Sequence, residues 1–206
     1  MKHVLFVIEQ AIGLAALIAL SPILLIAGVA IWILSRNAPL VAHRRLGRDG
    51  RPFWMLKFRT MWPSEACSNR QRSGALFIEK LRNKAVPEIK TGDDPRVTSR
   101  FASFCRMHSI DELPQLWHVA TGEMSFVGPR PMTPQEWSKH YGDSAAEVLR
   151  LKPGLSGLWQ TRGRNRLTYH QRRRLDIFLA RHYCLILYLR ILGSTVPRVL
   201  TGRDAC

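Results

Sequence analysis

The sequence predicts an α/β fold in which a compact, mainly helical domain with a few short strands follows a hydrophobic N-terminal helical segment. Three observations lead to this prediction. Residues 10–35 carry no charge, residues 39–62 alternate in the manner of two strands, and the chain from residue 99 onward is mainly of helical pattern. With 206 residues and 46% hydrophobic content, the chain suits one domain with its own core and is not a disordered tail.

The uncharged run from Gln10 to Ser35 contains 26 residues, which exceeds the roughly 20 apolar residues that a membrane-spanning helix needs. A secretory signal has a shorter apolar core, so that class is excluded. Ser21-Pro22 interrupts the run, because proline removes a backbone hydrogen bond and a serine hydroxyl can bind a freed carbonyl. A spanning helix with a kink and a helix pair that returns to the same side both remain open. The arginines that follow the run place its second end in the cytoplasm.

Beyond the hydrophobic run, the pattern predicts short elements in a fixed order. Two strands surround a turn at Gly47 to Pro52, and residues 63–92 form a surface excursion or a short helix. A helix over 99–122 is broken near Ser109. The remaining expectations are an apolar run and loop at 124–131, a helix at 134–150, a turn and strand at 151–160, and helix over 166–200. The last segment has a basic start and an apolar, aromatic body, which suits either a membrane-interface helix or an ordinary core helix.

The formal net charge of +16 arises from 31 Lys and Arg against 15 Asp and Glu, so the partner of this protein is expected to be anionic. Nucleotide phosphates, an anionic membrane surface and nucleic acid are the candidate classes. The four cysteines are scattered without a CxxC pair, which argues against a structural zinc site.

Two adjacent acids, Asp111 and Glu112, stand out in this basic chain. One interpretation is a capping box, in which Ser109 caps a helix and Glu112 lies three residues later. The other is chemistry, because one carboxylate can bind Mg²⁺ while its neighbour attacks phosphorus. Cations that would neutralise phosphate oxygens occur elsewhere in the chain, and they include Lys57, Arg59, Arg106 and Arg130.

Five stretches occur in order behind the Ser-Pro break: KFRTM, DDPRVTSRF, SIDELPQLW, GEMSFVGPRP and KPGLSGLWQ. Together they resemble the bacterial sugar transferases, the monotopic polyprenyl-phosphate phosphoglycosyl transferases, in their small form. The resemblance covers roughly Glu9 to Thr195. It implies transfer of a sugar 1-phosphate from a UDP-sugar to polyprenyl (undecaprenyl) phosphate, with release of UMP. This step begins the assembly of an exopolysaccharide, capsule, O-antigen or glycoconjugate.

The resemblance also assigns roles to residues of this chain. Asp111 would be the nucleophile of a ping-pong reaction, forming a covalent phosphosugar intermediate, and Glu112 would bind Mg²⁺ with Asp111 beside it. The expected phosphate ligands are Lys57, Arg59, Arg106, Arg130 and Arg164. The expected supporting residues are Gly128, Pro129, Pro131 and Asp176.

The family pattern further implies that Ser21 and Pro22 turn the N-terminal segment back, so that both of its ends face the cytosol. Residues 1–36 would form this re-entrant membrane anchor. Residues 37–206 would form the catalytic domain, with interfacial amphipathic helices at about 166–200. The expected location is the cytosolic face of the bacterial inner membrane. Membrane lipids are expected partners, nucleic acid is not, and a homodimer is possible.

The sequence departs from the family pattern at several positions. Phe6 and Val7 stand where a Lys-Arg pair is usual, and Glu9 replaces an Asp. His118 replaces an Asn, and an Asp of the last helix is replaced around Tyr188. Two alternatives of different kind stay open: direct attack by the lipid phosphate without a covalent intermediate, and a membrane-tethered polyanion binder without catalysis.

Overall fold

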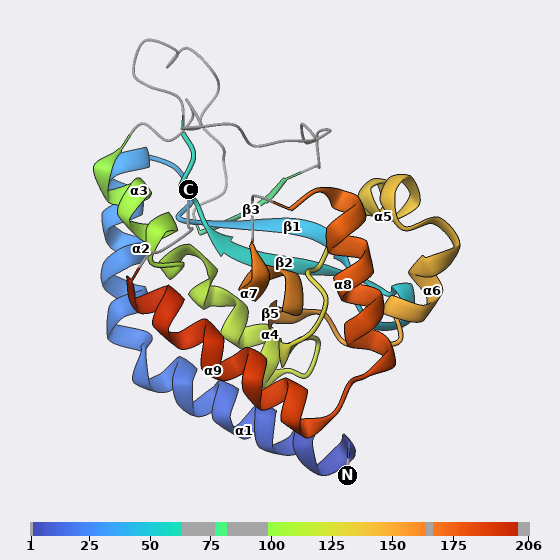
Figure 1. Cartoon of the computed structure of the whole chain (residues 1–206). Coiled ribbons are helices and arrows are strands. Elements are labelled where there is room, and N and C mark those ends of the chain that lie inside the picture. Colours follow the sequence, from blue (N-terminus) through green and yellow to red (C-terminus); the bar gives the residue numbers. More distant parts are fainter. Residues whose placement is uncertain (1, 63–76, 82–98, 164–166, 202–206) are drawn as a thin grey trace.

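The hydrophobic N-terminal run forms two helices, α1 (Lys2–Ala19) and α2 (Ser21–Ser35), and the pair is bent by 58° (Figure 1). This computed structural model describes residues 2–62, 77–81, 99–163 and 167–201. The bend confirms the predicted break, since the Ser21 hydroxyl donates to the Ile18 carbonyl at 2.7 Å and Pro22 stands in the first turn of α2. Among the described residues, no single helix is long and apolar enough to cross a bilayer, and only the bent pair taken together meets that test.

A buried carboxylate fastens α1 to the rest of the protein. Glu9 is only 4% exposed, and its Oε1 atom accepts hydrogen bonds from the Tyr188 hydroxyl at 2.7 Å and the Phe126 N–H at 3.1 Å. The Ser125 hydroxyl donates to the same oxygen. Ser125 and Phe126 belong to strand β4 (Ser125–Val127), and Tyr188 belongs to helix α9 (Leu185–Thr201). Two positions at which the sequence departs from the family pattern, Glu9 and Tyr188, are therefore hydrogen-bonded partners.

Replacing the Glu9 carboxylate is expected to weaken the attachment of α1 to β4 and α9. Glu9→Leu leaves three donors without their acceptor, and buried unsatisfied groups are costly, so the free energy of unfolding should fall by about 2–4 kcal/mol. Glu9→Gln keeps an acceptor oxygen and should lose much less. Chemical unfolding of the two variants in the same detergent measures the difference. Equal losses would show that the acceptor oxygen is not what fastens α1.

The predicted hairpin is present as strands β1 (Leu40–Leu46) and β2 (Pro52–Phe58), which pair antiparallel with Leu40 opposite Phe58. Its turn contains the 3-10 element η1 (Arg48–Gly50), where Asp49 and Gly50 both have positive φ. Strand β3 (Ile78–Leu81) pairs parallel to β1, which gives the sheet order β2-β1-β3. The expectation of a surface excursion or short helix was wrong for these four residues. The parts of 63–92 around β3 lie outside the described residues.

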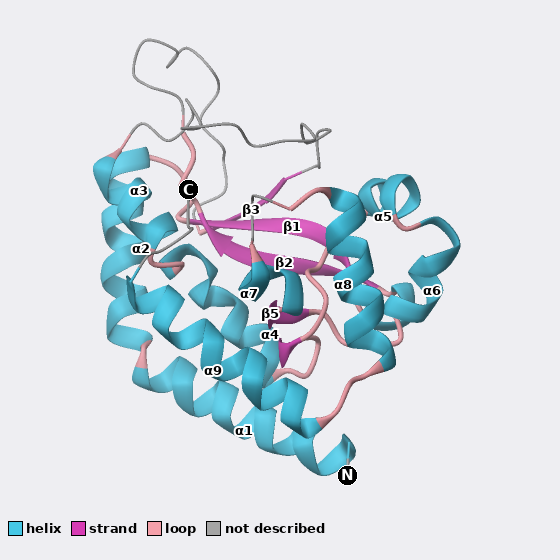
Figure 2. Ribbon diagram, viewed as in Figure 1, coloured by secondary structure: helices cyan, strands magenta, loops and turns pink. Residues whose placement is uncertain are grey.

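Short helices cover this sheet and the small parallel pair formed by β4 and β5 (Gly154–Ser156), as Figure 2 shows. The predicted helix over 99–122 is divided at Ser109, as expected. The strand predicted within 151–160 ends at Ser156, and a helix begins at Leu158. The helical elements are α3 (Arg100–Met107), η3 (Ile110–Gln115), α4 (Leu116–Ala120), α5 (Pro134–His140), η4 (Gly142–Ser144), α6 (Ala145–Val148), α7 (Leu158–Arg162), α8 (Tyr169–Arg181) and α9. The expected mainly helical, compact domain with a few short strands is thus confirmed.

The hydrophobic core sets the position of the acid pair. Ala27 and Ile31 of α2 pack with Phe58 at the end of β2 and with Ala102 of α3, and Ile110 packs against this cluster. Because Ile110 immediately precedes Asp111, burying its side chain fixes the start of η3 against the end of β2. Lys57, next to Phe58 on that strand, is therefore held close to the two acids.

Candidate active site

The acid pair lies on η3, which begins after a residue in the left-handed backbone region. Ser109 has φ 55°, and its side chain makes no capping hydrogen bond. The Glu112 N–H instead donates to the Ser109 carbonyl at 3.0 Å. The capping-box interpretation was therefore wrong, because a capping serine has extended backbone angles and accepts with its hydroxyl. The acids owe their position to the turn at Ser109 rather than to a cap.

Lys57 joins the two acids. Its Nζ lies 2.8 Å from Oδ2 of Asp111 and 3.2 Å from Oε1 of Glu112. Asp111 is buried, with 3% of its surface exposed, whereas about a quarter of the Glu112 side chain is exposed. One ammonium thus serves two carboxylates, and only one of these is open to solvent.

Burial and charge oppose each other in this cluster. Burial raises the pKa of Asp111, and the ammonium of Lys57 opposes that rise without cancelling it. Burial by itself would lower the pKa of Lys57, but Asp111 and Glu112 outweigh it and the pKa of Lys57 is raised. Lys57 is therefore charged at neutral pH and favours the ionised form of Asp111.

Arg130 is held in a rigid loop beside this cluster. Its Nη1 lies 3.9 Å from Oε1 of Glu112, and the prolines on both sides of it are buried. The loop is pinned to β5, because the Gly128 N–H donates to the Ser156 carbonyl at 2.9 Å and the Pro129 carbonyl accepts from the Gly154 N–H at 2.9 Å. A Cβ on Gly128 would collide with the backbone of residues 152–154, so this position requires glycine.

The remaining predicted phosphate ligands, Arg59, Arg106 and Arg164, do not all lie at the acid pair. Arg59 pairs with Glu79 of β3, and its Nε donates to the Ala38 carbonyl at 2.8 Å, so it reaches a different carboxylate from Lys57. Arg106 stands in the last turn of α3, and its charge lowers the pKa of Asp111. Arg164 lies outside the described residues. The structure therefore brings Lys57, Arg106 and Arg130 to the acid pair.

Asp176 belongs to an adjoining buried cluster rather than to the acid pair. It is fully buried on α8 and accepts a hydrogen bond from the Tyr141 hydroxyl at 2.6 Å. Burial raises the pKa of Asp176 to about 7, against the opposing effects of Tyr141 and Arg172. Arg172 is close enough to Arg130 for the two charges to interact, and its guanidinium lies 4.6 Å from the centre of the Trp159 ring. Asp176 thus lies in a buried cluster that is linked to Arg130 through the charge of Arg172.

A cavity of about 180 Å³ opens next to Glu112. Its walls are mostly apolar and come from η3, α4, β4, β5, α7 and the face of α9 that carries Leu192 and Thr195. No pattern in the sequence indicated that α9 would lie near Glu112. The Ser156 and Thr195 hydroxyls lie 2.6 Å apart, which joins the KPGLSGLWQ stretch to α9 at this cavity. Glu112 therefore faces a space with one polar end and one apolar side.

His118, which stands where the family pattern has an Asn, positions β2. The Leu56 N–H donates to its Nε2 at 3.0 Å, so Nδ1 carries the ring hydrogen and donates to Glu123 at 2.7 Å. These bonds fix the strand one residue before Lys57. His118 accordingly orients the lysine and does not enter the site.

The carboxylates offer a partial set of metal ligands. Within the described residues, no group of three or more His, Cys, Asp and Glu side chains is placed to hold a metal ion. Mg²⁺, however, is commonly bound by one or two carboxylates together with waters and substrate phosphates. A partly exposed Glu112 beside a cavity fits that kind of site, and Asp111 is its neighbour.

Comparison with known proteins agrees with this geometry. The profile of the family described as bacterial sugar transferase matches residues 2–202. The exopolysaccharide production protein ExoY of Sinorhizobium fredii is 40% identical over 94% of this chain and 84% of its own length. The UDP-galactose-lipid carrier transferase of Erwinia amylovora is 39% identical over 84% of this chain. The undecaprenyl-phosphate galactose phosphotransferase of Salmonella typhimurium is 36% identical over 78% of it.

These relatives differ in length. The match spans about a third of the Erwinia and Salmonella proteins, 36% and 33%, but most of ExoY. With a family profile that covers nearly all of its residues, the chain belongs to the bacterial sugar transferases.

Proposed function

We propose that this protein transfers a sugar 1-phosphate from a UDP-sugar to polyprenyl phosphate, with undecaprenyl phosphate as the acceptor. The observation that carries the proposal is the buried Asp111, held 2.8 Å from Lys57 and next to a Glu112 that is open to a cavity. The names of two relatives support the substrates, since one names UDP-galactose and the other undecaprenyl phosphate. The product would begin an exopolysaccharide or related glycan, as the name of ExoY suggests.

In the first step, a carboxylate oxygen of Asp111 attacks the β-phosphorus of the UDP-sugar. A bond forms between that oxygen and phosphorus, and the bond from the β-phosphorus to the bridging oxygen breaks, so that UMP leaves with the bridging oxygen. Lys57, Arg106 and Arg130 are placed to stabilise the negative charge on the phosphate oxygens. Arg59 and Arg164 were expected to add to this set.

In the second step, an oxygen of polyprenyl phosphate attacks the phosphorus of the phosphosugar–Asp111 intermediate. The Asp111 oxygen–phosphorus bond breaks, which restores the carboxylate and leaves a polyprenyl-diphosphate sugar. The apolar wall contributed by α9 suits the lipid part of the acceptor. Direct attack of the lipid phosphate on the donor is the alternative route. A polyanion binder without catalysis is less well supported, because the acid pair would repel its ligand.

Glu112 is proposed to bind Mg²⁺, which supplies charge neutralisation for the diphosphate. Glu112→Gln should therefore lower the rate and also raise the Mg²⁺ concentration needed for half-maximal rate, by about tenfold or more. A Mg²⁺ titration of UMP release measures both effects. The matched control is Glu147→Gln, whose carboxylate pairs with Arg181 away from the site. An unchanged Mg²⁺ dependence in Glu112→Gln would remove Glu112 from the metal site.

The exposed apolar side chains of the N-terminal helices support a membrane anchor. Ile18 of α1 and Leu25 and Ile26 of α2 are 65–70% exposed, and Ile186 of α9 is 66% exposed. Such surface is favourable against lipid rather than water. We propose that residues 1–36 form a re-entrant anchor with both ends at the cytosolic face and that residues 37–206 form the catalytic domain, with α8 and α9 at the interface.

The Ser21-Pro22 break is expected to determine this topology. Ser21→Ala with Pro22→Ala removes the hydroxyl bond to Ile18 and restores a backbone donor, which favours one straight, spanning helix. In cells, a cysteine at position 2 (Lys2→Cys) should then become accessible to a membrane-impermeant thiol reagent added outside. With Ser21 and Pro22 intact, the cysteine at position 2 should stay unlabelled. The protein without Lys2→Cys is the control for labelling of the native cysteines. Failure to label the double variant would count against Ser-Pro as the determinant.

Release of UMP tests the function as a whole. Purified protein with Mg²⁺ and undecaprenyl phosphate is given a panel of UDP-sugars, beginning with UDP-galactose, and the control omits the lipid. Release that needs the lipid and occurs with one sugar would establish the reaction and identify the donor. If no donor in a panel of hexoses, N-acetylhexosamines and modified sugars yields UMP, the proposed transfer is rejected.

A further inference from the structure

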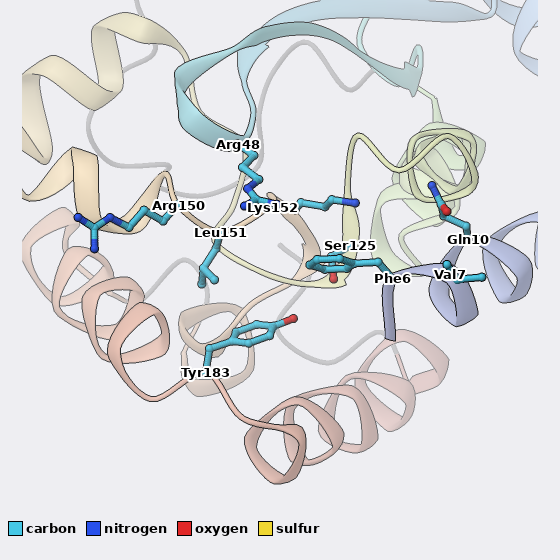
Figure 3. Close-up of a pocket in the computed structure, with 9 residues that line it drawn as sticks. All are labelled: Phe6, Val7, Gln10, Arg48, Ser125, Arg150, Leu151, Lys152 and Tyr183. Carbon is cyan, nitrogen blue, oxygen red and sulfur yellow. The ribbon is translucent and has the colours of Figure 1, made fainter. Parts of the chain in front are cut away.

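A second and larger cavity, of about 410 Å³, lies at the N-terminal end of α1 (Figure 3). Residues of α1, η1, β4, the segment 150–152 and the segment before α9 surround it. It shares no lining residue with the cavity beside Glu112. The proposed transfer reaction therefore leaves this cavity without a role.

Three cations from two separate parts of the chain line the cavity. Arg48 comes from η1, and Arg150 and Lys152 come from the segment that precedes β5. None of the lining residues, all within the described part of the chain, is acidic. In Figure 3 the side chains of Arg48 and Lys152 lie together at the cavity, whereas the Arg150 side chain extends away from them. Cations placed around a cavity in this way favour an anion within it.

The acids nearest to these cations are already engaged. The Oε1 of Glu9 accepts from Tyr188, Phe126 and Ser125. Glu147, whose pKa Arg150 helps to lower, is bound by two nitrogens of Arg181 at 2.7 and 3.0 Å. Asp49 lies 3.5 Å from Arg48, but both side chains are more than half exposed, so that this pairing is weak.

The surroundings of Lys152 show that positive charge is concentrated at the cavity. Its Nζ lies 4.2 Å from the centre of the Phe6 ring. Burial lowers the pKa of Lys152, Glu9 opposes the shift, and Arg48 adds to it. A bound phosphate group would relieve the repulsion between Arg48 and Lys152.

Apolar and aromatic side chains also line the cavity, which adjoins the surface proposed to meet the membrane. Phe6, Val7 and Tyr183 line it, and Val7 is 65% exposed on the same helix as the exposed Val4 and Ile8. The cations therefore lie at the edge of an exposed apolar helix face. A phosphate with hydrocarbon chains attached matches this combination of cations and a neighbouring apolar helix face.

We propose that this cavity binds the phosphate of an anionic glycerophospholipid headgroup, with the acyl chains lying along the exposed face of α1. Phe6 and Val7 stand where the family pattern has a basic pair, so in this chain the cations come from Arg48, Arg150 and Lys152 instead. The inference rests on the proposed membrane placement of α1 and not on the transfer reaction. A lipid bound here would hold the N-terminal end of α1 at the membrane surface.

The test uses the full chain in neutral detergent and a short-chain lipid, dihexanoyl-phosphatidylglycerol, whose binding is measured by calorimetry. Saturable binding is expected, with dihexanoyl-phosphatidylcholine and inorganic phosphate at least about tenfold weaker, because a net lipid charge and the chains both contribute. The variant Arg48→Gln with Arg150→Gln should bind phosphatidylglycerol about tenfold more weakly or worse. The control, Arg51→Gln with Arg174→Gln, removes the same charge from exposed positions that do not line the cavity and should bind normally.

Each of the following results would contradict the inference for a different reason. Equal weakening in both double variants would mean nonspecific attraction to a basic surface. Phosphate binding as tight as that of the lipid would mean a simple anion site. Undecaprenyl phosphate bound more tightly than phosphatidylglycerol, with loss in the Arg48/Arg150 variant, would assign the cavity to the acceptor. Because no donor is present, failure of this test is independent of failure of the transfer assay.

Discussion

Asp111→Asn is expected to lower sugar-phosphate transfer by at least about a thousandfold while the protein stays folded. An amide of nearly the same shape fills the buried position but is not a competent nucleophile. Lys57 keeps Glu112 as a partner at 3.2 Å, so no unpaired charge is left behind. Lipid-dependent UMP release measures the loss, and thermal unfolding checks the fold.

The matched control for this change is Asp49→Asn. Asp49 is an exposed acid in the turn after β1 and has no contact with the acid pair, so transfer should be unchanged. Near-normal turnover by Asp111→Asn would show that Asp111 is not the nucleophile. It would leave direct attack by the lipid phosphate as the better account.

Lys57→Met is expected to have the second-largest effect, with a loss of roughly a hundredfold at neutral pH. The ammonium of Lys57 lowers the pKa of Asp111, and burial already raises that pKa. Without Lys57 the pKa of Asp111 rises further, so the attacking carboxylate forms only at higher pH. The acid limb of the pH–rate profile should therefore move to higher pH, and part of the lost rate should return there.

Lys80→Met is the control for this change, since Lys80 is an exposed lysine on strand β3. It should keep both the rate and the pH profile. A uniform loss at all pH values in Lys57→Met would mean that Lys57 binds substrate without adjusting the ionisation of Asp111.

Local chemistry made part of the fold predictable. Proline lacks a backbone donor, so the break at Ser21-Pro22 follows from the sequence, and alternation with a Gly-containing turn predicts the β1–β2 hairpin. Strand β3 was missed because it pairs with β1, which is distant in the sequence. The residues of β3 alone do not indicate such a long-range pairing. Ser109 was misjudged for a similar reason, since its left-handed backbone is imposed by the packing of α3 and η3.

The site was predictable to the extent that motif residues approach one another. Lys57, Asp111, Glu112 and Arg130 meet as the motifs suggested. Arg59 was expected beside them, but the pairing of β3 with β1 brings Glu79 within its reach. The partnership of Glu9 and Tyr188 joins positions 179 residues apart. The signal for it was that both positions depart from the family pattern.

The measurement that tests the central claim most directly is the intact mass of the protein after incubation with its UDP-sugar and Mg²⁺ in the absence of polyprenyl phosphate. A covalent mechanism predicts a mass gain equal to one sugar 1-phosphate less one water, stoichiometric release of UMP, and loss of the adduct when the lipid is added. The adduct should map to Asp111 and be absent in Asp111→Asn. A protein that turns over with lipid but never gains this mass would contradict the covalent role of Asp111.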